Sequence, residues 1–132
     1  MKKILEYLLP ILWMLFSLFL FLAPPSDFDT GNSLFDFPHK DKVAHIVIFG
    51  ILSFLWMRVF NRTNLKTGTN ISIYALIGFI VLSWAISTEV MQATLTTTRS
   101  GDILDVFADL FGGSLGIVGY HILNRTALKV FC

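Results

Sequence analysis

Residues 99–119 read RSGDILDVFADLFGGSLGIVG, and this stretch decides the fold because it aligns carboxylates and glycines on one helix. The aligned residues stand at i, i+3, i+7, i+10 and i+14: Asp102, Asp105, Asp109, Gly112 and Gly116. Residues at these spacings share one face of an α-helix. Glycines on that face allow a neighbouring helix to approach closely. We therefore expect the three carboxylates to be held against other helices.

Three more apolar stretches precede this one, and the composition is that of a membrane protein. The chain has 132 residues, of which 55% are hydrophobic and 14% are charged, whereas soluble domains carry about 25% charged residues. A helix that spans a bilayer needs about 20 apolar residues. We predict an all-α, four-helix transmembrane bundle that forms a single domain over residues 1–132. Its expected spans are residues 4–23, 43–60, 71–95 and 102–123.

The lysines and arginines predict the orientation of the bundle, because cytoplasmic loops are enriched in them. With the N-terminus inside, seven fall on the inner side: Lys2, Lys3, Arg58, Arg62, Lys66, Arg125 and Lys129. Three fall on the outer side: Lys40, Lys42 and Arg99. We therefore predict that both termini are cytoplasmic. The net charge of +1 gives no field that would attract nucleic acid, so no nucleic-acid partner is expected.

Ionisable side chains within the predicted spans gather toward one end of the bundle. Such residues are costly in a membrane and usually mark a functional site. The second span begins with Lys42 and His45. The third span ends with Glu89 and Gln92, and Arg99 precedes the aspartates of the fourth. Because successive spans alternate in direction, all these residues fall in the outer half of the membrane. We predict a polar pocket there.

The predicted pocket carries an excess of negative charge. With His45 neutral, Lys42 and Arg99 stand against Glu89 and the three aspartates, which gives a formal charge of −2. Charge removed from water has to be compensated. Protons on the carboxylates or a bound divalent cation would do so, while solvation of Asp102 at the rim would reduce the buried excess to −1. Oxygen ligands favour Mg²⁺, Ca²⁺ or Mn²⁺, and the imidazole of His45 adds Zn²⁺.

The order and spacing of these residues resemble the VanZ-like family. The resemblance extends from Pro38 to about Gly119 and rests on this pattern: Asp41-Lys42-x-x-His45, Glu89-x-x-Gln92, and Arg99-Ser100-Gly101-Asp102-x-x-Asp105-x-x-Ala108-Asp109-x-x-Gly112-x-x-x-Gly116. The founding member is an accessory protein of glycopeptide resistance that lowers sensitivity to teicoplanin. The resemblance implies a multi-pass protein of the bacterial cytoplasmic (inner) membrane. The family usually has Asn where this chain has Asp109, and it supplies no established reaction.

We expect the pocket to act on or bind a phospholipid or lipid-linked envelope component. Lys42 and Arg99 would clamp an anionic headgroup, since arginine suits bidentate phosphate binding, with Gln92 and Asp102 also binding substrate. Four side chains are candidates for acid–base chemistry or for holding a metal ion: His45, Glu89, Asp105 and Asp109. The expected partners are membrane lipids or lipid-linked envelope precursors.

Two other functions remain open. The first is a non-catalytic accessory or scaffold factor, in which the polar cluster holds the helices together. The second is a small multidrug transporter, which is less expected because such proteins typically carry a membrane glutamate in the first span, and here Glu6 lies near its inner end. Gly112 and Gly116 are candidates for helix packing, either within one chain or between the chains of a homo-oligomer.

Overall fold

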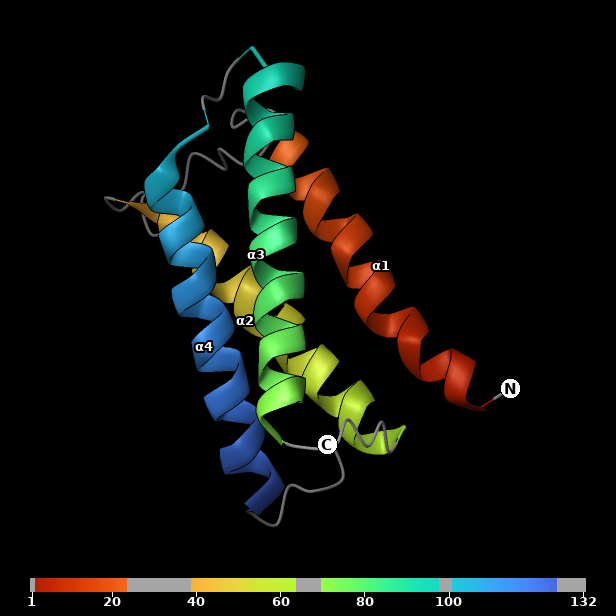
Figure 1. The fold of residues 1–132 in the computed structure, drawn as a ribbon. Helices are drawn as coiled ribbons and strands as arrows, with labels where there is room; N and C mark the ends of the chain where they lie inside the picture. The colour runs from red at the N-terminus through yellow and green to blue at the C-terminus, as the bar shows by residue number, and fades with distance from the viewer. Residues whose placement is uncertain (1, 24–38, 64–69, 98–100, 126–132) are drawn as a thin grey trace, which may run out of the picture.

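The computed structural model describes four helical segments and the residues next to them. The described residues are 2–23, 39–63, 70–97 and 101–125. The helices are α1 (Lys2–Leu22), α2 (Lys40–Arg62), α3 (Asn70–Leu95) and α4 (Ile103–Arg125), and no strand occurs within the described ranges (Figure 1). Each helix is long and apolar enough to cross a membrane. The predicted all-helical architecture with four candidate spans is confirmed, whereas the orientation of the termini stays a prediction.

The closest helix contact joins α2 and α4, through the predicted glycine stripe. A Cβ atom added to Gly112 would overlap the backbone carbonyl oxygen of Ile46, and one added to Gly116 would overlap that of Gly50. The two backbones therefore touch, as small residues permit between helices in a membrane. This approach lies within one chain, and it carries the carboxylate end of the α4 stripe to the beginning of α2.

Two tryptophans attach α1 to the other helices. The indole nitrogen of Trp13 donates to the carbonyl oxygen of Ile48 on α2 at 2.9 Å. The indole nitrogen of Trp84 on α3 donates to the hydroxyl of Ser17 at 3.1 Å. These bonds satisfy polar groups that would otherwise lack partners among apolar side chains. They hold α1 beside α2 and α3 (Figure 1).

The outward faces of all four helices are apolar, as a surface in contact with lipid requires. Phe19, Val47, Phe79 and Phe111 are examples, one from each helix. The interior holds a smaller apolar core, whose largest fully buried members include Phe49, Leu52, Met57 and Ile77. The core continues to Phe60 and Tyr120 toward one end of the bundle, while the buried charged residues lie toward the other.

Candidate functional site

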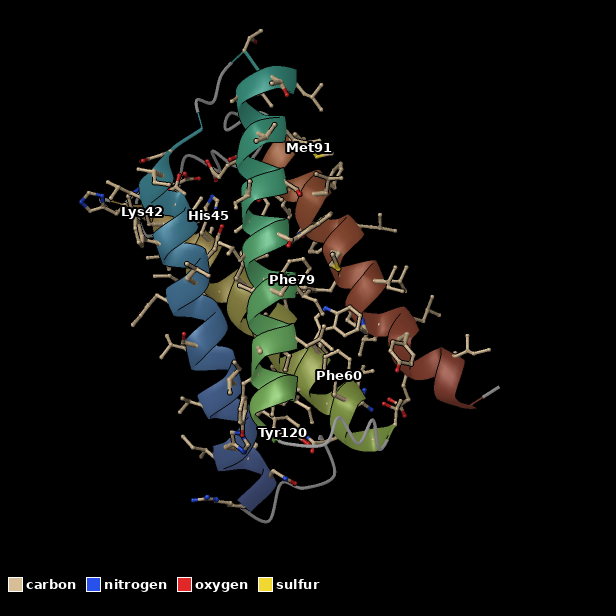
Figure 2. All side chains as sticks on the ribbon, in the orientation of Figure 1. Lys42, His45, Phe60, Phe79, Met91 and Tyr120 are labelled. Atoms are coloured by element: carbon tan, nitrogen blue, oxygen red, sulfur yellow. The ribbon has the colours of Figure 1, made fainter. Side chains whose placement is uncertain are left out.

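The polar residues meet where α2 and α4 begin and α3 ends. Figure 2 shows Lys42 and His45 at this end of the bundle, while Phe60 and Tyr120 lie toward the other. Lys42 is at the mouth of the site, with 29% of its side chain exposed. Its ammonium donates to Asp105 at 2.6 Å and to Asp102 at 3.1 Å. This outer layer therefore joins the first turns of α2 and α4.

Asp102 reaches this position because it is the N-cap of α4. Its Oδ1 accepts a hydrogen bond from the backbone N–H of Leu104 at 2.9 Å, which satisfies one of the free donors at a helix start. That bond and the Lys42 ammonium lower the pKa of the Asp102 carboxyl. Asp102 is therefore ionised at neutral pH and is held in place by the helix that it caps.

A second, buried layer lies beneath Lys42. One turn along α2, His45 Nδ1 lies 2.9 Å from Asp109 Oδ1, and both side chains are fully buried. At a rise of 1.5 Å per residue, His45 lies about 4.5 Å further along its helix than Lys42. The third member is Glu89 on α3, which is 7% exposed. The site therefore has a partly exposed ammonium in its outer layer and a buried group of one imidazole and two carboxyls beneath it.

Glu89 is fixed by the turn that leads into α4. Its Oε2 accepts a hydrogen bond from the backbone N–H of Asp102 at 2.8 Å. Glu89 therefore provides a partner for the backbone donor of the N-cap residue of α4. Gly101 permits this approach, because a Cβ at that position would lie 3.1 Å from the backbone oxygen of Glu89 and 3.3 Å from the side chain of Ala93. Oε2 of Glu89 thereby supports the turn, while Oε1 is buried without a hydrogen-bond partner among the described residues.

The end of α1 closes the site on its remaining side. The ring of Phe21 stacks on His45, with 4.4 Å between ring centroids. The amide nitrogen of Gln92 donates to the carbonyl oxygen of Phe21 at 3.1 Å. Gln92 therefore anchors α1 to α3, and Phe21 fixes the plane of the imidazole. All four helices contribute to the site.

Three polar atoms of the buried layer have no hydrogen-bond partner in the described part of the chain. They are His45 Nε2, Glu89 Oε1 and Asp109 Oδ2. Buried polar atoms are nearly always paired in native proteins, and exceptions call for an explanation. His45, Glu89 and Asp109 each offer one ligand atom, all within 4.8 Å of one another. Asp41, His45 and Asp105 form a second group of this kind, but Asp41 is exposed.

A comparison with protein-family models identifies the family of the chain. The VanZ/LLP1 family model matches residues 6–124. The chain belongs to the VanZ/LLP1 family. This confirms the resemblance drawn from the sequence pattern, and the matched region takes in nearly all of the four helices of this VanZ/LLP1 protein. Comparisons with curated proteins and with solved structures give no match.

The structure brings seven of the eight predicted ligand-binding or acid–base residues of this VanZ/LLP1 protein to one end of the bundle: Lys42, His45, Glu89, Gln92, Asp102, Asp105 and Asp109. The eighth, Arg99, lies outside the described residues. Their roles stay predictions. Phe21 was not predicted from the sequence, because an aromatic residue in an apolar span carries no distinguishing signal. Gly50 was not predicted either, because the spacing of α2 alone does not single it out.

Proposed function

We propose that this VanZ/LLP1 membrane protein binds the headgroup of a phospholipid or lipid-linked envelope component at the polar end of its bundle and does acid–base chemistry on it. We propose further that this activity contributes to glycopeptide (teicoplanin) resistance. The observation that carries the proposal is the layered site, in which Lys42 lies above the buried pair of His45 and Asp109.

The outer layer supplies headgroup contacts. An ammonium has three N–H donors, and Asp102 and Asp105 take two of them. The third donor of Lys42 is suited to a phosphate or hydroxyl oxygen. Because two carboxylates flank Lys42, the mouth also suits a headgroup that carries a cationic or hydroxyl group beside its phosphate. A simple anion would meet repulsion there.

The inner layer supplies a proton donor and acceptor. A hydrogen bond from Nδ1 to Asp109 would orient the imidazole of His45 and leave Nε2 as the acceptor, as in other sites where a carboxylate supports a histidine. Glu89 adds a second acid–base group from α3. Phe21 stacks on His45 and the three side chains are buried, and electrostatic effects on a reacting group are strongest in such low-dielectric surroundings.

The same contacts also support the non-catalytic alternative, in which the cluster serves to join helices. The bonds of Lys42 to the first turn of α4 and of Glu89 to Asp102 are helix-to-helix links. The three buried atoms without described partners favour the proposal over this alternative, because a purely structural cluster would be expected to satisfy its own polar groups.

The proposal is tested by complementing a strain that lacks the chain and measuring teicoplanin sensitivity. The variants are wild type, Glu89→Gln, and the control Glu6→Gln, which makes the same substitution at the opposite end of the bundle. Glu6 pairs with Arg58 and Arg62 there. Protein abundance in the membrane is measured alongside.

We expect Glu89→Gln to reach normal abundance and to leave the strain as sensitive as the deletion, while Glu6→Gln restores resistance. Glutamine keeps an oxygen that can accept the N–H of Asp102, so the fold is preserved. Full resistance with Glu89→Gln would overturn the proposal. A parallel loss of abundance and resistance would favour the structural alternative.

A further inference from the structure

The buried layer contains three ligand atoms that converge without a described occupant. His45, Glu89 and Asp109 come from three different helices, and one nitrogen or oxygen from each lies within 4.8 Å of the others. Two carboxylate oxygens of this group, Glu89 Oε1 and Asp109 Oδ2, are buried and lack hydrogen-bond partners in the described segments. His45 and Asp109 are fully buried and Glu89 is 7% exposed. The convergence is therefore internal, unlike a cluster of acids on a solvated surface.

We propose that His45, Glu89 and Asp109 form a binding site for one divalent transition-metal ion, Zn²⁺ or Mn²⁺. The distances suit such an ion. Two ligand atoms of a tetrahedral ion with bonds of about 2.1 Å lie about 3.4 Å apart. One ligand atom from each of the three side chains already lies within 4.8 Å of the others. Closing the longest such separation takes at most about 1.4 Å.

The charge balance favours an ion over an empty site. When Glu89 and Asp109 are both ionised and the imidazole of His45 is neutral, the buried layer carries a charge of −2. A divalent cation cancels that charge, so neither carboxylate is left as a buried unpaired ion. Lys42 cannot do this, because its ammonium is already bonded to the two carboxylates of the outer layer.

The donor set selects the kind of ion. An imidazole nitrogen favours Zn²⁺ and related metals, while carboxylate oxygens also accept Mn²⁺. Three protein ligands leave at least one coordination position open, as in catalytic rather than structural zinc sites. That open position would receive an oxygen of the headgroup, and this part of the inference rests on the proposed function. The binding of the ion itself does not rest on the proposed function.

The test measures metal bound to the purified full chain in lipid nanodiscs. Protein stripped with chelator is loaded with Zn²⁺ or Mn²⁺, dialysed, and assayed by elemental mass spectrometry, with Mn²⁺ also followed by electron paramagnetic resonance. We expect about one ion per chain in the wild type and in Glu6→Gln. In Glu89→Gln and Asp109→Asn we expect the affinity to fall by at least about 10-fold. Equal binding by all four proteins, or no binding by the wild type, would overturn the proposal.

A second measurement guards against misfolded variants. Saturating Zn²⁺ should raise the midpoint of thermal unfolding of the wild type and of Glu6→Gln, but not that of Glu89→Gln. An equal rise in all three would place the ion elsewhere and overturn the proposal. The outcome is independent of the function proposed above. If the ion binds at Glu89 but the Glu89→Gln variant retains full resistance, the metal site is supported and the proposed lipid function is refuted.

Discussion

Replacing Gly116 by alanine should separate α2 from α4 and destabilise the bundle. The added Cβ would overlap the carbonyl oxygen of Gly50 and lie 2.8 Å from its carbonyl carbon. Ordinary contacts of a Cβ begin at 3.4 Å, so the two backbones would have to move apart by at least about 0.6 Å. Neither contact atom belongs to a side chain that could rotate away. The two helices α2 and α4 would therefore have to move apart along their interface.

The size of the effect follows from two opposing contributions. Overpacking costs up to about 3 kcal/mol, and the upper end applies because the clash is between backbones. Alanine recovers about 1 kcal/mol of helix propensity over glycine. We expect Gly116→Ala to lower the free energy of unfolding by about 2 kcal/mol. Gly119 lies one turn further along α4 and has no atom within 4 Å of an added Cβ. Gly119→Ala should therefore be neutral or slightly stabilising.

The assay is reversible unfolding of both variants in mixed micelles, followed by circular dichroism. The matched pair holds the helix, the substitution and the neighbourhood nearly constant, so the difference reports the contact with α2. Equal unfolding free energies for Gly116→Ala and Gly119→Ala would refute the close backbone packing on which the geometry of the site depends.

Three further outcomes are expected. Lys42→Met leaves Asp105, whose side chain is 7% exposed, without its cation and should lower the unfolding midpoint in the same assay; adding Asp105→Asn should recover part of the loss. Trp84→Phe removes the donor to Ser17 and should lower the free energy of unfolding by about 0.5–1.5 kcal/mol. An unchanged unfolding midpoint would show that this hydrogen bond does not stabilise the bundle. The Asp102 pKa is lowered in the folded protein, so its stabilising effect is present above the free value of about 3.9 and is lost as the pH falls through the lower folded value. Unfolding curves from pH 7 to pH 3 should therefore show a smaller acid destabilisation in Asp102→Asn than in the wild type.

The fold and the membership of the site were predictable because one pattern served both. The spacing of the aspartates and of Gly112 and Gly116 placed them on one helix face, and the alternation of span directions brought them to the same end as Lys42 and Glu89. Each inference needed only helix periodicity and chain direction.

The pairing of side chains was not predictable in the same way. Whether Lys42 bonds Asp105 or Asp109 depends on the register between α2 and α4, which the contact of Gly116 with Gly50 sets. Periodicity within one helix carries no information about that register. Phe21 was missed for a related reason, since its stacking on His45 depends on how α1 crosses the bundle.

The proposed action of the polar site on an envelope lipid is tested by an untargeted profile of lipids and lipid-linked precursors in cells. The strains are wild type, a deletion, and the deletion expressing Glu89→Gln or Glu6→Gln at equal abundance. If the polar site processes an envelope lipid, one species accumulates in the deletion, stays high with Glu89→Gln and returns to normal with Glu6→Gln. Identical profiles in all four strains, with teicoplanin sensitivity still different between wild type and deletion, would contradict the proposed action.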